Sequence, residues 1–253
     1  KHPDYAVGDK LMARFAWQTH SLSDGGDFIA RLPDELEFNP SAYMGVLGDT
    51  GMSAYFGMTD IAKPTSNDCV LISGAGGAVG TIAGQIAKLA GARVVGIVGS
   101  QKKADWLCEA LGYDAAVIRS GDTPLTQAIA DACPAGVDVF FDNVGGQTLE
   151  AAISNMNHRG RLVLCGAISG YGVTPHGPGN LFELITKELS VEGGTITAVV
   201  NLTEGCPNYR EGELEYLRVA IPDTESADIT PHVNEISDFI DRYLTSGGCV
   251  LVH

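Results

Sequence analysis

The residues of this chain with the clearest chemical meaning are three glycines that follow a short apolar run. Residues 68–73 are mostly β-branched or apolar, and glycines recur at intervals of three from Gly74 onward. From Ala78 the apolar residues recur at helical spacing. A strand, a glycine turn and a helix together can hold a pyrophosphate, because the glycines allow a tight turn and the helix start attracts anions. A tight turn that binds no ligand can have the same glycines, but the strand before these glycines and the helix after them favour dinucleotide binding. The predicted phosphate-binding residues are Gly74, Gly77, Ala78, Val79 and Gly80.

Short apolar strands and amphipathic helices alternate through the middle of the chain. Strands of about five residues separated by longer helices indicate βαβ units and a parallel sheet. We therefore expect an α/β fold with a doubly wound parallel Rossmann sheet of about six strands, and a ligand at the carboxyl ends of the strands. The expected strands are 68–73, 93–98, 115–118, 137–141, 161–165 and 189–198, and helices are expected from 78 and over 101–111, 124–133, 147–156 and 181–188.

The two ends of the chain lack this regular alternation. Residues 1–38 look like short strands at the edge of a small barrel, which cannot form a core alone. Two helices are expected after residue 39, with a break around 48–51. The further expectations are strands at 5–10, 11–17, 28–33 and 249–252 and helices at 213–220 and 233–244.

Composition limits the partners and the chemistry. The formal net charge of −15 argues against nucleic acid, which requires a basic face. No apolar run approaches the roughly 18 residues of a membrane span. The six cysteines include no C-x-x-C pair, which is typical of free thiols in a reducing compartment. We therefore expect a cytoplasmic protein, and we expect no metal site because the cysteines and histidines lack ligand spacing.

The residues after the second predicted strand bear on the choice of cofactor. An NAD site usually has an acidic residue there, whereas this chain has Gly99 and Ser100, followed by Lys102 and Lys103. Small residues and cations suit a 2′-phosphate, so the pattern predicts NADPH. A solvated helix start is the alternative, but lysines are slightly unfavourable at that end of a helix, which favours a phosphate partner.

Several of these segments together resemble the medium-chain dehydrogenase/reductase superfamily. The resemblance covers about residues 40–195 and is strongest to the zinc-independent branch of prostaglandin reductases, alkenal double-bond reductases and curcumin reductases. Its most specific motif is the loop Phe141-Asp142-Asn143-Val144-Gly145-Gly146. Residues 199–235 match the family poorly. The other matching segments are 46–48, 51–57, 74–80, 84–88, 94–96, 99–103 and 165–171.

The resemblance implies a domain organisation and a reaction. The NADPH-binding domain would be residues 39–200, while residues 1–38 and 201–253 would belong to a GroES-like barrel, most of which would precede Lys1. The reaction would be NADPH-dependent reduction of the C=C bond of α,β-unsaturated aldehydes and ketones, with hydride transfer to the β-carbon. A quinone reductase of the same superfamily and a cofactor-binding chain without turnover are the alternatives. The partners would be a small-molecule enone or alkenal and a second copy in a homodimer through the last sheet strand.

The resemblance also implies residue roles. Lys103 and Arg119 would contact the 2′-phosphate. Tyr171 would face the substrate. We expect it to be either the donor to the developing oxyanion or a wall of the substrate pocket, and a surface tyrosine is the alternative. Tyr55 fits a core position better than a site, and Asp142 fits a turn better than an acid or base. The residues expected along the rest of the cofactor are Met52, Ser53, Asn143, Cys165, Ala167, Ile168 and Ser169.

Overall fold

The computed structural model forms two compact units, residues 45–194 and residues 1–44 together with 195–253. No helix in the described part of the chain combines the length and the apolar character needed to cross a membrane. The residues that the structure describes are 4–13, 19–23, 29–32, 38–171, 177–193, 198–203, 215–221 and 250–252.

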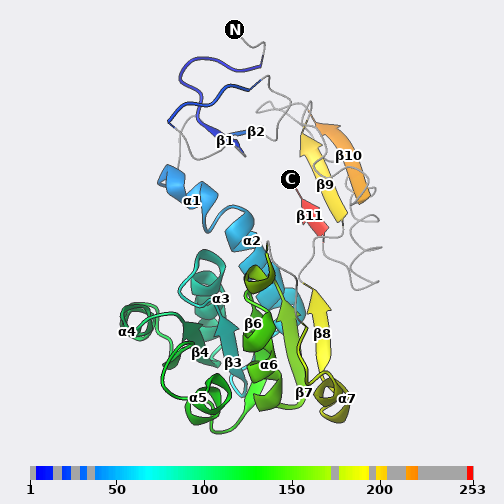
Figure 1. Ribbon diagram of the computed structural model, residues 1–253. Helices are drawn as coiled ribbons and strands as arrows, with labels where there is room; N and C mark the ends of the chain where they lie inside the picture. The colour runs from blue at the N-terminus through cyan, green and yellow to red at the C-terminus, as the bar shows by residue number, and fades with distance from the viewer. Residues whose placement is uncertain are drawn as a thin grey trace. The chain divides into compact units, whose positions relative to one another are not determined.

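Residues 45–194 contain a six-stranded parallel sheet (Figure 1). The chain enters at the centre of the sheet, moves outward to one edge, returns to the centre and moves outward to the other edge. This order defines a doubly wound dinucleotide-binding fold, so the predicted Rossmann sheet is confirmed. In spatial order the strands are β5 (Ala115–Ile118), β4 (Arg93–Val98), β3 (Cys69–Ser73), β6 (Val137–Asp142), β7 (Met156–Leu164) and β8 (Ser190–Gly193).

Helices cover both faces of this sheet. They are α2 (Asp49–Phe56), the π-helix η1 (Gly57–Ala62), α3 (Ala78–Leu89), α4 (Gln101–Ala110), α5 (Leu125–Ala132), α6 (Gly146–Asn155) and α7 (Phe182–Thr186). Alternate residues of a strand face opposite sides. Val70 and Ile72 of β3 therefore pack into one apolar core with α2, η1, α3 and α4, whereas Leu71 packs into a second core with α5 and α6. The central strands are buried on both faces, which explains their continuous apolar sequences.

The element boundaries between residues 40 and 193 agree closely with the sequence prediction, with three differences. The last strand, expected over 189–198, is β8 (Ser190–Gly193), and Ala198 begins β9 (Ala198–Thr203) of another sheet. Strand β7 begins at Met156 rather than at Arg161. The break between the first two helices, predicted around 48–51, lies earlier, at residues 45–48, because α1 (Pro40–Met44) ends at Met44 and α2 begins at Asp49.

The second unit contains two small sheets. Strand β1 (Leu11–Ala13) pairs antiparallel with β2 (Ile29–Arg31). Strand β9 (Ala198–Thr203) lies between β10 (Glu215–Ile221) and β11 (Val250–Val252), and both pairings are parallel.

Two predictions for this unit are wrong. A helix was expected over 213–220, but β10 is a strand, because pairing with the distant β9 overrides a local preference. A strand was expected over 5–10, where the chain instead turns and the Asp9 N–H donates to the Ala6 carbonyl at 3.2 Å. The short final strand is confirmed. The helix expected over 233–244 and residues 14–17 lie outside the described residues, and the barrel remains a prediction.

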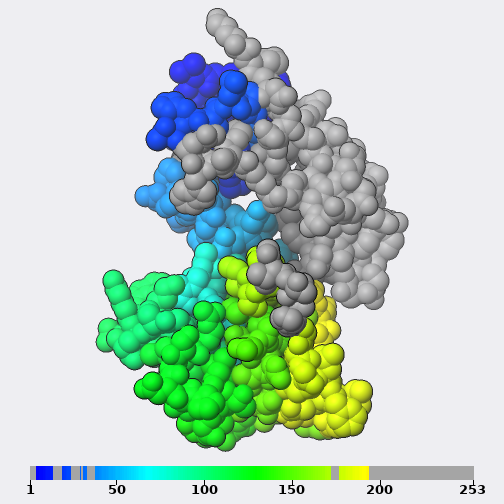
Figure 2. All heavy atoms as spheres, in the orientation of Figure 1, coloured from blue at the N-terminus to red at the C-terminus, as the bar shows by residue number. Residues whose placement is uncertain are grey.

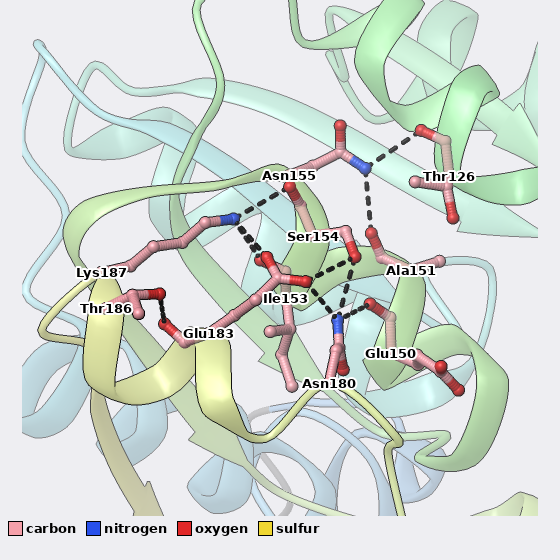
Figure 3. Close-up of polar contacts among 10 residues, drawn as sticks. All are labelled: Thr126, Glu150, Ala151, Ile153, Ser154, Asn155, Asn180, Glu183, Thr186 and Lys187. Carbon is pink, nitrogen blue, oxygen red and sulfur yellow. Dashed lines mark hydrogen bonds and ion pairs between the residues drawn. The ribbon is translucent and has the colours of Figure 1, made fainter.

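Polar side chains attach α7 to the end of α6 (Figure 3). Asn180 Nδ2 donates to Ser154 Oγ at 2.9 Å and to Glu183 Oε1 at 3.1 Å. Lys187 Nζ lies 2.8 Å from Glu183 Oε2 and donates to the Ile153 carbonyl at 2.9 Å, so its charge lies at the carboxyl end of α6, where a helix favours a cation. The hydrogen bond from Lys187 lowers the pKa of Glu183. These contacts fix the segment that leads into β8.

Candidate dinucleotide-binding site

The glycine turn between β3 and α3 has the geometry that a phosphate cradle requires. Gly74 has a φ of +58°, which residues with side chains rarely adopt. An added Cβ at Gly80 would lie 2.5 Å from the Gly74 oxygen, so glycine is needed for α3 to pack this close to the turn. Gly77 is the N-cap of α3, and its N–H donates to the Gly74 carbonyl at 2.8 Å. The three predicted glycines therefore form one compact turn.

The start of α3 can receive an anion. Gly77 has no side chain to cap the first turn, and both Gly77 and Ala78 are exposed. Backbone N–H groups at a helix start, together with the helix dipole, favour a phosphate. Ala78 and Val79 lie in this first turn, as the sequence predicted. The turn and the helix start thus fit the pyrophosphate of a dinucleotide.

Lys103 lies across the glycine turn. Its aliphatic stem packs on Gly76, where an added Cβ would lie 3.0 Å from Lys103 Cδ. The Lys103 N–H donates to Ser100 Oγ at 3.4 Å, and Ser100 is the N-cap of α4. Gly99 has no neighbouring atom that would meet an added Cβ within 4 Å. Gly99, Ser100 and Lys103 therefore meet at the carboxyl end of β4, beside the phosphate cradle.

Arg119 lies at the same edge of the sheet. It follows β5 directly, and its N–H donates to the Val98 carbonyl of the neighbouring strand at 2.8 Å. Both Arg119 and Lys103 are exposed. Lys103 at the carboxyl end of β4 and Arg119 at that of β5 thus form an arrangement suited to a 2′-phosphate.

The loops after β6 and β7 interlock. The Ile168 N–H donates to the Asn143 carbonyl at 3.3 Å, and the Ser169 N–H and hydroxyl both donate to the Val144 carbonyl, at 3.0 and 2.6 Å. Gly146 has a φ of +57°, and an added Cβ there would lie 2.9 Å from Ser169 Oγ. Asn143 and the segment 165–169, which includes Cys165 and Ala167, are therefore brought together beside the glycine turn.

Cys165 is half-buried in this second loop. Burial is the main cause that raises the pKa of its thiol, and the nearby Asp142 carboxylate raises it further. The Cys165 N–H donates to the Asp142 carbonyl at 2.8 Å. Cys165 is therefore a protonated, weakly nucleophilic thiol at neutral pH.

Helix α2 carries Met52 and Ser53. Its Ala54 is fully buried in the same core as Ala83 of the phosphate-binding helix α3. Met52 is half-buried and Ser53 is exposed, with the Ser53 hydroxyl donating to the Asp49 carbonyl at 2.8 Å. The packing thus holds Met52 and Ser53 on an element that contacts α3.

The two tyrosines considered from the sequence are both exposed. Tyr171 is 67% exposed and follows a short 3₁₀ helix, η2 (Ile168–Gly170), and its hydroxyl accepts the Ala167 N–H at 3.4 Å. The expectation that Tyr55 belongs to the core is wrong, because its side chain is 54% exposed. The helical apolar pattern did not show that Ala54 and Met58 face the core while Tyr55 does not.

Two supporting residues were not identified from the sequence. Tyr113 is buried, and its hydroxyl donates to the Gly80 carbonyl in the first turn of α3 at 2.7 Å. An added Cβ at Gly84 would collide with the Tyr113 ring, so the only available signal was a glycine inside a helix. Ser73 is buried at the end of β3 and bonds to Asp142 at 2.6 Å. Asp142 is the turn residue that the sequence predicted, because its carboxylate accepts the Val144 and Gly145 N–H groups.

Fold and site together define a dinucleotide-binding domain of the kind found in nicotinamide-dependent oxidoreductases. The family model described as "Zinc-binding dehydrogenase" matches residues 78–205. Among the described residues, no three His, Cys, Asp or Glu side chains come together as a metal site requires.

Similar proteins place the chain within this family. NADPH-dependent curcumin reductase of Escherichia coli is 38% identical over 74% of this chain and 54% of its own length. Prostaglandin reductase 1 of Bos taurus is 42% identical over 76% of this chain and 59% of its own length. The crystal structure of CurA from Vibrio vulnificus with NADPH superposes with a TM-score of 0.67 at 28% identity, over 98% of this chain and 66% of that chain.

The chain belongs to the zinc-independent branch of the medium-chain dehydrogenase/reductase superfamily, as the sequence motifs predicted. It spans between about half and two thirds of the length of these three proteins.

Proposed function

We propose that this chain provides the NADPH site of a reductase that reduces the C=C bond of α,β-unsaturated aldehydes or ketones. The observation that carries the proposal is the interlocking of the Asn143 loop with the 165–169 loop beside the glycine turn. Relatives named for curcumin and prostaglandin reduction support this substrate class.

The cofactor, when bound, would supply the hydride. The Gly74–Gly80 turn and the start of α3 hold its pyrophosphate, and Lys103 and Arg119 pair with its 2′-phosphate. Met52, Ser53, Asn143 and the 165–169 loop flank its nicotinamide half. These two cations give the site a preference for NADPH over NADH, because NADH lacks the 2′-phosphate with which they pair.

We assign Tyr171 the role of hydrogen-bond donor to the substrate. Reduction at the β-carbon puts negative charge on the carbonyl oxygen, and a hydrogen-bond donor directed there lowers the barrier. Because the Tyr171 hydroxyl accepts the Ala167 N–H, its own hydrogen remains available for donation. Replacing Tyr171 with Phe removes the donor and retains the ring. We expect kcat to fall by about 10- to 100-fold, which is at or below the loss typical of removing one oxyanion donor.

The first test follows the loss of NADPH absorbance with a simple enone and, separately, with a quinone. Faster oxidation with the enone supports the proposal. Faster oxidation with the quinone would move the chain to the quinone reductases. Tight NADPH binding without turnover on either substrate would show that this chain binds the cofactor but does not complete the reaction.

Cofactor preference is tested by Lys103→Glu. The substitution places a negative charge beside the 2′-phosphate, so NADPH affinity should fall by about 10- to 100-fold, which corresponds to the loss of one charge-assisted contact. NADH affinity should change little. Lys63→Glu is the control, because Lys63 lies between η1 and the amino end of β3, whereas Lys103 and Arg119 follow the carboxyl ends of β4 and β5. Equal losses for NADPH and NADH would contradict the assignment of Lys103.

We further assign the edge strand β8 to a contact between two copies of this chain. Among the described strands, β8 pairs only with β7, and all four of its residues are exposed. Phe182, Ile185 and Val191 are 72%, 73% and 45% exposed along this edge, and Figure 2 shows the segment in yellow on the surface. Antiparallel pairing of β8 with its copy would satisfy the open edge.

The dimer is tested by Val191→Lys in light-scattering measurements of molar mass. We expect the wild-type protein to be a dimer and the variant to shift toward monomer. Leu89→Lys is the control, since Leu89 is 89% exposed at the end of α3. A wild-type monomer would overturn the assignment.

A further inference from the structure

The two central strands of the sheet are linked by a buried polar pair at their carboxyl ends. Strands β3 and β6 are neighbours at the point where the strand order reverses, which is where ligands bind in such sheets. Ser73 is the last residue of β3 and Asp142 is the last residue of β6, and both are 0% exposed. The Ser73 hydroxyl donates to Asp142 Oδ1 at 2.6 Å. The pair therefore joins the ends of the two strands from which the cofactor loops start.

The Asp142 carboxylate organises the turn that follows it. It accepts the Val144 N–H at 2.9 Å and the Gly145 N–H at 3.0 Å, in addition to the Ser73 hydroxyl. Gly145 has a φ of +72°, a conformation that lets consecutive N–H groups point at one carboxylate. Burying a carboxylate is costly unless hydrogen bonds satisfy it, so this turn has one strongly favoured conformation.

The same network fixes the side chain of Asn143. Its backbone N–H donates to Ser73 Oγ at 2.7 Å, and its Nδ2 donates to the Ser73 carbonyl at 2.8 Å. A backbone carbonyl can only accept, so the amide is oriented with its nitrogen toward Ser73. Its Oδ1 is therefore directed away from Ser73 and is able to accept a hydrogen bond from a ligand.

The network also reaches the 165–169 loop, which follows β7. The Asp142 carbonyl accepts the Cys165 N–H at 2.8 Å and the Gly166 N–H at 3.0 Å. Asp142 thus contacts the turn after β6 through its side chain and the start of the 165–169 loop through its backbone. One buried residue is common to both loops.

We infer that Ser73 and Asp142 are positioning residues that set Asn143 and the 165–169 loop in place for the nicotinamide half of the cofactor, and that they act on hydride transfer more than on binding of the adenosine half. This inference rests on the proposed reductase function. Neither side chain would touch the cofactor or the substrate. Their effect passes through Asn143 and the loop backbone.

The test compares Asp142→Asn with Asp138→Asn. Asp138 is a matched control, because it accepts the Cys69 N–H at 2.8 Å and joins the same two strands at their amino ends. In the cofactor-free protein, Asp142→Asn should speed amide hydrogen exchange at residues 143–145 and 165–169 by about tenfold, the effect of losing one buried hydrogen bond. Asp138→Asn should leave these amides unchanged.

Binding and turnover give the second part of the test. Affinity for 2′,5′-ADP, which lacks the nicotinamide half, should be the same in wild type and Asp142→Asn. With an enone, kcat should fall by about 10- to 100-fold with little change in the KM for NADPH, because misplaced reacting groups slow the chemical step. The primary deuterium isotope effect should rise as hydride transfer becomes slower. Ser73→Ala should show the same pattern with a smaller loss, which provides a second variant if Asp142→Asn does not fold.

The outcomes separate this inference from the proposed function. Unchanged exchange and unchanged kcat in Asp142→Asn would overturn the positioning role even if the wild type reduces enones. A parallel loss of 2′,5′-ADP affinity and kcat would also overturn it, because the pair would then maintain the structure of the adenosine half of the site as well as that of the nicotinamide half. If the wild type reduces no enone, a rise in exchange confined to residues 143–145 and 165–169, together with unchanged 2′,5′-ADP binding, still supports positioning of the nicotinamide half.

Discussion

The two ends of the β3–β6 strand pair are built from similar parts but differ in what surrounds them. At the amino end Asp138 accepts the Cys69 N–H at 2.8 Å, and at the carboxyl end Asp142 accepts the Ser73 hydroxyl at 2.6 Å. The second oxygen of Asp138 accepts Asn157 Nδ2 at 2.8 Å, which completes a side-chain pair between strands. Asp142 instead accepts backbone N–H groups of a loop.

The difference follows from the direction of the strands. In a parallel sheet every carboxyl end lies at the same edge, where the strands lead into helix starts with free N–H groups. A buried aspartate at that edge can organise loops around a ligand. The same residue type at the opposite edge can only join strands, so position in the sheet rather than residue type decides the role.

The largest effect should come from filling the glycine turn at the carboxyl end. Gly80→Val places atoms against the Gly74 carbonyl, so α3 must move away from the turn and NADPH affinity should fall by about 10- to 100-fold, the cost of overpacking by 1–3 kcal/mol. Isothermal titration with NADPH measures the loss. Gly121→Ala is the control, because an added Cβ there meets nothing closer than 3.4 Å. Unchanged affinity in Gly80→Val would show that close packing of α3 is not needed.

At the amino end, Asp138→Ala should affect stability but not binding. The Cys69 N–H and the Asn157 amide lose their acceptor, so the free energy of unfolding should fall by about 1–3 kcal/mol. Denaturant titration measures this change, and NADPH affinity should stay within twofold, roughly the error expected for independent sites. Loss of NADPH affinity beyond the loss of folded protein would remove the distinction between the two ends.

The rates at which cysteines are alkylated give a second comparison between the carboxyl and amino ends of the central strands. Burial, followed by the Asp142 charge, raises the pKa of Cys165 above its ordinary value of 9.0, so its alkylation by iodoacetamide should be slow at neutral pH and its rate should still be increasing with pH at pH 9.0. Asp142→Asn should shift this profile to lower pH, because the carboxylate no longer disfavours the thiolate. Cys69 and Cys133 at the amino end are 5% and 2% exposed and should react only on unfolding. Mass spectrometry of each peptide gives the rates, and an unshifted Cys165 profile would contradict the electrostatic role of Asp142.

The smallest effect should come from the contacts between α6 and α7. The hydrogen bond from Lys187 lowers the pKa of Glu183 below its ordinary value of 4.5, so its contribution to stability is present above pH 4.5 and is lost as the pH falls through the folded-state pKa. Glu183→Gln should reduce stability at neutral pH by less than about 1 kcal/mol, because the pair is partly solvated. Thermal unfolding against pH measures the difference, which should vanish in acid. A difference that persists in acid would show that packing rather than charge is responsible.

Local sequence patterns determined the fold class. Alternating apolar strands and amphipathic helices predicted the doubly wound sheet, because burial on both faces requires those periods along the chain itself. The spacing of Gly74, Gly77 and Gly80 predicted the phosphate turn, because a tight turn and a closely packed helix start need residues without a side chain. The family motifs placed Asn143 and Lys103 in the candidate site, and their cofactor contacts remain predictions.

Tertiary structure decided the features that depend on contacts between distant residues. That Lys103 packs on Gly76, that Tyr113 bonds to Gly80 and that Asp142 bonds to Ser73 follow from how strands and helices pack, which no local period encodes. Residues 215–221 form a strand because β9 pairs with them, and Tyr55 is exposed because its neighbours Ala54 and Met58 occupy the core. The sequence by itself specified the sheet and the turn that begins the site, whereas the buried pair joining the loops of that site became visible only when β3 and β6 lay side by side.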